Sequence, residues 1–169
     1  MKWPSGAASR WPFLVILSAL VVFAPALGGE LLEWDDDINI LDNPRVWSLT
    51  GDNLVWMFTD ISQALRFKAL SWLSWTLVYS VSGTSGVGYH AANLALHVAN
   101  AALLYALITR LFGKLGGAVG DDARWPAFAG ATFWALGPLR AEPIAWATGL
   151  PYCQATLFVR LSLRYHLDA

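Results

Sequence analysis

The residues best suited to chemistry are carboxylates gathered in one part of the chain. Eight of the 12 acidic residues lie between Glu30 and Asp60, opposed there only by Arg45. Within this stretch, Asp35 and Asp36 open the run DDDINILDNP. Adjacent carboxylates repel each other, so the run is suited to a general base or to a bound divalent cation that helps a phosphate group to leave. From composition alone, a solvated acidic turn is the favoured interpretation, because charge runs are usually solvated.

A second candidate is a polar stripe on an apolar segment. His90, Asn93, His97 and Asn100 are spaced so that they fall on one side of a helix. Such groups inside a membrane face a wet cavity or form hydrogen bonds between helices. We expect a structural role for His97 and Asn100, and His90 stays open between a structural role and a site. An ion or proton pathway is the weakest alternative, because Glu142 is its one candidate acidic partner.

The third candidate is the run GPLRAEP at residues 137–143. Arg140 and Glu142 can pair with each other or with groups on other helices. Arg140 suits a lipid phosphate, although its side chain can also extend to the membrane surface. Pro138 and Pro143 break a helix and release backbone groups that can line a cavity.

The amino-acid composition indicates the class of protein that carries these candidate residues. Of the 169 residues, 56% are hydrophobic and only 14% are charged, whereas a soluble domain has about 25% charged residues. A single cysteine excludes a disulfide scaffold and a multi-thiolate metal site. A net charge of -1 without a basic block gives no basis for nucleic-acid binding. We therefore predict an all-α, polytopic integral membrane protein.

Long stretches without charge predict about four transmembrane helices, since a helix needs about 20 apolar residues to cross a bilayer. The segment 62–82 is instead predicted to lie as a helix at the outer interface, because serine and threonine alternate there with tryptophan and tyrosine. The first segment also resembles a cleaved secretory signal, which is the alternative to a retained helix. The predicted parts are a cytoplasmic N-terminus with the first transmembrane helix (1–29), an acidic loop (30–88), the second transmembrane helix (89–109), a cytoplasmic loop (110–124), and the third and fourth transmembrane helices (125–169).

The distribution of lysine and arginine predicts how these segments are oriented across the membrane. Basic residues lie at the ends of the apolar segments that are remote from the acidic loop, and short cytoplasmic loops are enriched in lysine and arginine. This places the acidic loop on the extracytoplasmic side of a bacterial inner membrane or an ER-like membrane. The basic residues concerned are Lys2, Arg10, Arg110, Lys114, Arg124, Arg160 and Arg164.

Four runs together resemble one family. The acidic run resembles the "DD…NP" signature of membrane glycosyltransferases of the GT-C class, in particular the transmembrane-and-TPR proteins similar to dolichyl-phosphate-mannose O-mannosyltransferases. Further along the chain, RFKALSWLSW at 66–75 resembles "YYRPLxxLSW", and GYHAANLALH at 88–97 is similar to "GYHxxNxxxH". GPLRAEPIAW at 137–146 resembles "HPLxxExVAW". The four runs occur in the family's order.

The resemblance implies transfer of a sugar from a polyprenyl-phosphate donor to an acceptor on the extracytoplasmic face, as in protein O-mannosylation. It implies that Asp35 or Asp36 is the catalytic base. Lys68, His90 and Arg140 are then the donors available to the lipid phosphate, and Glu142 is a further substrate-binding candidate. A divalent cation stays open, and the resemblance identifies no metal ligands. Relatives carry more helices and often TPR repeats, so a fragment of a longer protein is expected.

Several positions depart from the family pattern. Gly137 replaces a histidine, Ala69 replaces a proline, and Lys68 replaces an arginine, which removes the two-pronged contact that a guanidinium makes with phosphate. These departures favour the alternative function, a non-catalytic membrane scaffold subunit or a truncated inactive homologue.

Overall fold

The computed structural model describes residues 10–63, 67–115 and 123–168, and every regular element in those ranges is helical. The all-α prediction is thereby confirmed for the described residues. The elements are α1 (Arg10–Phe23), η2 (Ala24–Gly28), η3 (Asp37–Leu41), η4 (Pro44–Val46), α2 (Gly51–Thr59), α3 (Ala69–Ser82), α4 (Gly86–Leu115), α5 (Arg124–Ala135), η6 (Pro138–Arg140), α6 (Ala141–Ala145), η7 (Ala147–Gly149) and α7 (Leu150–Asp168).

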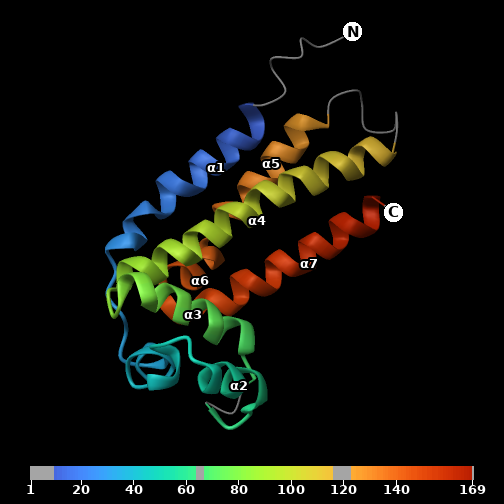
Figure 1. Ribbon diagram of the computed structural model, residues 1–169. Coiled ribbons are helices and arrows are strands. Elements are labelled where there is room, and N and C mark those ends of the chain that lie inside the picture. Colours follow the sequence, from blue (N-terminus) through green and yellow to red (C-terminus); the bar gives the residue numbers. More distant parts are fainter. Residues whose placement is uncertain (1–9, 64–66, 116–122, 169) are drawn as a thin grey trace.

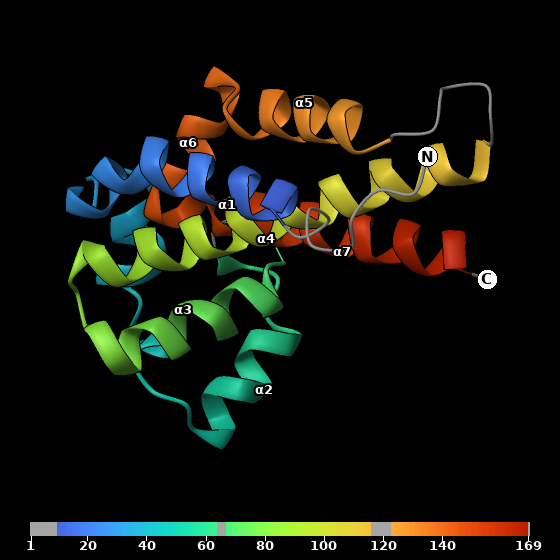
Figure 2. The ribbon, with the colours of Figure 1, turned by 90° about the horizontal axis from the view of Figure 1, so that it is seen from above.

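Helix α4 is the centre of the molecule. It contacts α1, α3, α5 and α7, and Figure 1 shows α1, α4, α5 and α7 running along the molecule in alternating directions. Seen from above, α5 and α3 lie on opposite sides of α4 (Figure 2). The acidic loop, with α2, is at one end of this bundle, and the start of α5 and the end of α7 are at the other (Figure 1).

Small side chains allow α1, α4 and α5 to approach closely. Val15 and Ala19 of α1 are fully buried together with Ala101 of α4 and three alanines of α5. Alanine at such an interface lets helix backbones come together, which is the usual way in which helices associate inside a bilayer. The three alanines of α5 are Ala127, Ala131 and Ala135.

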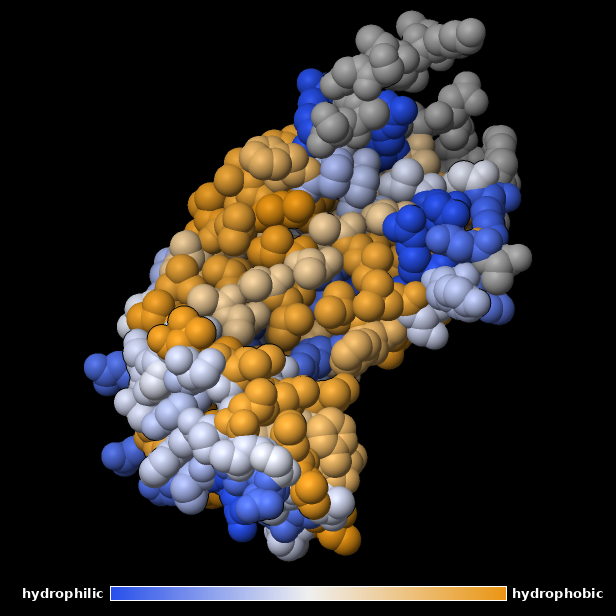
Figure 3. Space-filling model, in the orientation of Figure 1, coloured by the Kyte–Doolittle hydropathy of each residue, from blue (hydrophilic) through white to orange (hydrophobic). Residues whose placement is uncertain are grey.

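Two helical segments among the described residues could span a membrane by length and composition, 10–28 and 86–114. Apolar side chains are exposed along α1 and α7, Phe13 and Val21 on α1 and Phe158 and Val159 on α7. Figure 3 shows apolar residues covering the middle of this face, with hydrophilic residues gathered at both ends. This surface has the pattern of a protein that sits in a bilayer.

The predicted third segment, 125–147, differs from the observed helices, whereas the predicted fourth segment, about 151–168, coincides closely with α7 (Leu150–Asp168). Helix α5 has only 12 residues and ends at Ala135, and the chain then continues through η6, α6 and η7. Pro138 begins η6 and Pro143 lies within α6, so no continuous helix covers 125–147. Helix α7 has 19 residues but contains Arg160 and Arg164.

The acidic loop is more structured than predicted. It contains α2, which the sequence analysis did not predict, and α3 begins at Ala69 rather than at 62. Trp72 and Trp75 of α3 were expected at the membrane surface, but both are fully buried. They pack in one core with residues of the acidic loop and of α2 (Ile40, Val46 and Met57). Helix α3 is therefore a component of the protein core at this end of the bundle.

Two turns shape this region. The backbone N–H groups of Gln63 and Ser62 donate to the Asp60 carboxylate at 3.0 and 2.7 Å, and these hydrogen bonds lower the pKa of Asp60. The Asp60 carboxylate thus holds this turn through backbone N–H groups. Gly83 follows α3 with φ +55°, a backbone conformation that favours glycine, and its carbonyl accepts a hydrogen bond from the Tyr89 hydroxyl at 2.9 Å. This second turn reverses the chain from α3 into α4.

Candidate functional site

Asp36 has a structural position. Its side chain is fully buried, and one carboxylate oxygen accepts the backbone N–H of Leu32 at 3.0 Å. The other oxygen accepts the backbone N–H of Thr148 at 2.9 Å. Asp36 therefore ties the acidic loop to η7, more than a hundred residues further along the chain, and both of its oxygens are occupied by main-chain donors.

Asp35 borders an open cavity instead. This cavity, which we call the Asp35 cavity, has a volume of about 220 Å³. Lys68 also borders it, so the structure brings together two of the residues predicted from the sequence. Among the described residues, its lining is Asp35, Phe67, Lys68, Trp146, Thr148, Pro151 and Tyr152.

Asn39 connects these two residues. Its side-chain amide donates to the Asp35 carbonyl at 2.7 Å, and the Lys68 ammonium lies 3.5 Å from its side-chain oxygen. The ammonium also lies 5.7 Å from the centre of the Trp75 ring. Lys68 is therefore held by a buried amide and an indole face while it contributes positive charge to the Asp35 cavity.

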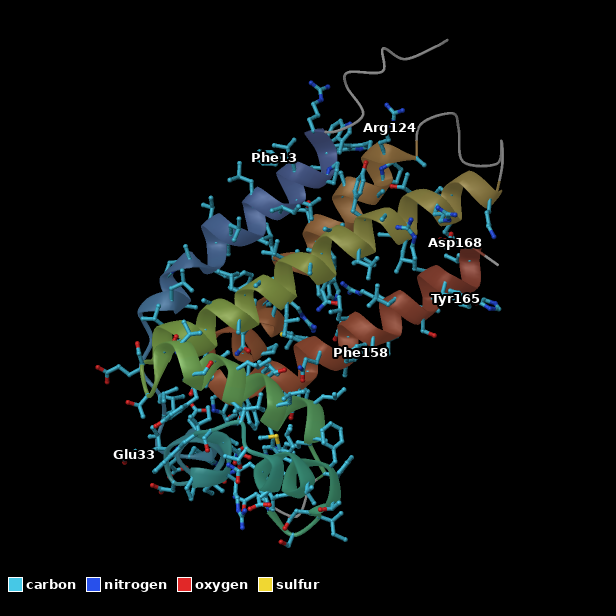
Figure 4. All side chains as sticks on the ribbon, in the orientation of Figure 1. Phe13, Glu33, Arg124, Phe158, Tyr165 and Asp168 are labelled. Carbon is cyan, nitrogen blue, oxygen red and sulfur yellow. The ribbon has the colours of Figure 1, made fainter. Side chains whose placement is uncertain are left out.

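Glu142 borders a larger, neighbouring cavity of about 520 Å³. Trp146 lines both this cavity and the Asp35 cavity, so this residue lies at the boundary between them. The other lining residues of the larger cavity are Leu32, Glu33, Trp34 and Ala145. Figure 4 shows Glu33 at the end of the molecule opposite Arg124 and Asp168.

Arg140 and His90 lie elsewhere. The Arg140 guanidinium is 5.2 Å from the centre of the Trp134 ring and borders a small cavity of about 30 Å³ with His97 and Asn100. His90 is fully buried near the junction of η2 and α4, where a Cβ on Gly29 would be 3.0 Å from its Nε2 atom. Neither residue lines the Asp35 cavity. Arg66, part of one resembling run, lies outside the described residues, as does Lys2.

The polar stripe on α4 binds backbone carbonyls of the broken segment and of α7. Asn93 donates its side-chain amide to the Trp146 carbonyl at 2.7 Å, and His97 lies 3.0 Å from the Ala135 carbonyl, at the end of α5. A helix that ends inside a bundle leaves carbonyls without intrahelical partners, and His97 lies at such a carbonyl. Asn100 donates to the Cys153 carbonyl, which belongs to α7, at 2.9 Å. The structural role expected for His97 and Asn100 fits these contacts.

Sequence reasoning missed three residues of this region. Thr148 and Asn39 carry no local pattern that marks them, because their importance arises from contacts with distant parts of the chain. Arg160 is almost fully buried with its guanidinium 3.8 Å from the centre of the Trp134 ring, and it donates to the Asn100 carbonyl. The position of this arginine in a mainly apolar segment was the one feature of the sequence that could have indicated its buried contact.

No group of three or more histidine, cysteine, aspartate and glutamate side chains that could hold a metal ion occurs within the ranges 10–63, 67–115 and 123–168.

Comparison with known proteins shows a likeness to a mouse protein. No protein-family model matches the chain, and no solved structure matches it. The chain is 32% identical over 119 residues to protein O-mannosyl-transferase TMTC2 of Mus musculus, a match that covers 69% of the chain and 13% of the relative. The chain thus spans a small part of that protein's length. This likeness supports a distant relation between the chain and a glycosyltransferase.

Proposed function

We propose that this chain forms the N-terminal part of a membrane glycosyltransferase, which moves a sugar from a polyprenyl-phosphate donor to an acceptor hydroxyl on the extracytoplasmic face. The observation that carries the proposal is the Asp35 cavity, in which a carboxylate and the Lys68 ammonium line the same space. The mouse relative, named as a protein O-mannosyl-transferase, supports the reaction class.

Asp35 and Lys68 suit the two parts of such a reaction, which are the removal of a proton from the acceptor and the departure of the phosphate. Asp35 accepts the proton of the acceptor hydroxyl while the hydroxyl oxygen bonds to the anomeric carbon of the sugar. The bond from that carbon to the phosphate oxygen breaks, and the phosphate leaves with the electron pair. Lys68 stabilises the negative charge that develops there. Asp36 stabilises the backbone around the Asp35 cavity, because its two carboxylate oxygens accept the backbone N–H groups of Leu32 and Thr148.

The larger cavity adjoins the Asp35 cavity at Trp146. Its lining surface is mainly apolar, and Glu33 and Glu142 are the charged residues among its described lining.

The proposal is tested by transfer from a radiolabelled polyprenyl-phosphate sugar, using the protein purified from membranes with its full natural chain. Asp35→Asn keeps the shape of the side chain but removes the base, so transfer is expected to fall by about 100-fold or more. Asp52→Asn is the matched control, because Asp52 is exposed in the first turn of α2, and its activity is expected to equal that of the wild type. Equal transfer by Asp35→Asn and wild type would contradict the assignment.

A further inference from the structure

Helices α4 and α7 border an apolar groove at the end of the molecule opposite the acidic loop, where both helices end (Figure 1). This groove, which we call the α4–α7 groove, has a volume of about 310 Å³. Leu111 is 47% exposed and Leu163 is 51% exposed, so the groove is open to the surroundings of the protein. Its size and its apolar lining suit a hydrocarbon chain. The described lining residues are Leu104, Leu107, Ile108, Leu111, Leu163, His166 and Leu167.

Positive charge gathers beside this groove. The sequences of α4 and α7 contain a single acidic residue, Asp168, and its carboxylate pairs with two guanidinium groups. One of these belongs to Arg110 of α4, and the other belongs to Arg164, whose Nε atom lies 3.4 Å from the carboxylate. Lys114 is exposed and follows Leu111 by three residues, so it lies on the side of α4 that lines the groove. The positive charges on these two helices therefore exceed the negative charge beside them.

We infer that the α4–α7 groove holds an acyl chain of an anionic phospholipid, whose phosphate lies against Lys114, Arg110 and Arg164. A phosphate group supplies the negative charge that these three bases lack, and hydrogen bonds between ionised partners are strong. His166 lines the groove beside Arg164, and its ring N–H can donate to a phosphate oxygen. Basic pockets between transmembrane helices on the cytoplasmic side of a membrane bind the headgroups of anionic lipids. An apolar helix in the groove would leave the excess positive charge without a partner, so a lipid is the occupant that the charges favour.

Binding of two lipids that differ only in their headgroups tests the inference. The protein, purified with its full natural chain and freed of lipid in detergent, is titrated with dioleoylphosphatidylglycerol, which is anionic, and with dioleoylphosphatidylcholine, which is zwitterionic. Native mass spectrometry measures the fraction of protein that carries each lipid. The wild type is expected to bind the anionic lipid at least about fivefold more tightly, which is the gain from one base near a lipid headgroup.

A pair of charge variants tests the headgroup contact. Lys114→Gln is expected to weaken phosphatidylglycerol binding by about fivefold and to leave phosphatidylcholine binding unchanged. Arg45→Gln is the control, because Arg45 is an exposed base in the acidic loop, at the other end of the molecule, and no change in binding of either lipid is expected. Equal weakening in the two variants would overturn the headgroup contact, because it would show an effect of total charge alone.

A pair of tryptophan variants tests the position of the acyl chain. Leu111→Trp places a larger side chain in the groove, so it is expected to weaken the binding of both lipids, which carry the same chains. Val81→Trp is the control, because Val81 is 87% exposed on α3 and does not line the groove, and no change is expected. Wild-type binding of both lipids by Leu111→Trp would overturn the placement of the chain in the α4–α7 groove.

Two outcomes for the wild type decide the inference without any variant. Equal affinity for the two lipids would overturn it. Retention of neither lipid would also overturn it, because another part of the full chain or a second copy of the protein would then fill the groove. None of these measurements uses sugar transfer, so lipid selectivity in a protein without transfer activity would uphold the lipid site and count against the proposed function alone.

Discussion

At the scale of single residues, the structure assigns different positions to two neighbouring acids. Asp35 borders a cavity that also contains Lys68, whereas Asp36 is fully buried and accepts two backbone N–H groups. The sequence has three consecutive aspartates, Asp35, Asp36 and Asp37, and nothing in it separates the role of Asp35 from that of Asp36. The difference depends on Thr148, which is far away in the chain, so no local pattern could have revealed it.

This division of roles predicts different effects on stability. Asp36→Ala leaves the backbone N–H groups of Leu32 and Thr148 without acceptors, so we expect a loss of about 2–4 kcal/mol in the free energy of unfolding. Asp37→Ala is the control, because the Asp37 carboxylate accepts only the N–H of the next residue, Ile38, and we expect a change below about 1 kcal/mol. Denaturant titration in detergent, followed by circular dichroism, measures both. Equal losses in the two variants would show that Asp36 has no special structural role.

At the scale of elements, the long helices were easier to predict than the segments between them. Helices α1 and α4 follow from long apolar stretches without charge, a signal that is local and strong. Pro138 and Pro143 marked the break after α5, although the exact turns depend on Asn93 and His97, which bind carbonyls of the broken segment. Helix α2 was missed because its apolar side packs into a core that only the folded acidic loop creates.

The broken segment contains a glycine that the packing requires. A Cβ at position 149 would lie 2.7 Å from the Pro143 carbonyl oxygen and 2.8 Å from its Cα, both of which are backbone atoms that cannot rotate away. We expect Gly149→Ala to lower the free energy of unfolding by about 1–3 kcal/mol, the usual cost of overpacking.

Gly113→Ala serves as the control for this substitution. A Cβ at position 113 would meet no atom of the described residues within 4 Å, and alanine is more favourable than glycine in a helix interior, so we expect unchanged or slightly higher stability. Thermal unfolding of both variants in detergent measures the difference. A Gly149→Ala variant as stable as Gly113→Ala would contradict the close contact between η7 and α6.

At the scale of the whole molecule, the charges divide the protein into two ends. Glu33 and the acidic loop lie at one end, and Arg124, Asp168 and the Arg110–Asp168 ion pair lie at the other (Figure 4). Between the ends, the surface shown in Figure 3 is mainly apolar. The chain also matches 13% of the length of a named mannosyltransferase, so the Asp35 cavity is proposed as one part of a larger catalytic unit.

The proposed function requires the acidic end of the protein to lie on the extracytoplasmic side of a membrane and the basic end to lie in the cytoplasm. The most direct measurement is labelling of intact cells with a membrane-impermeant maleimide, using Glu33→Cys and Arg124→Cys in a background in which Cys153 is replaced by serine. We predict that Glu33→Cys is labelled in intact cells and that Arg124→Cys is labelled only after the membrane is permeabilised. Labelling of both positions from the same side, or of Glu33→Cys only after permeabilisation, would contradict the account.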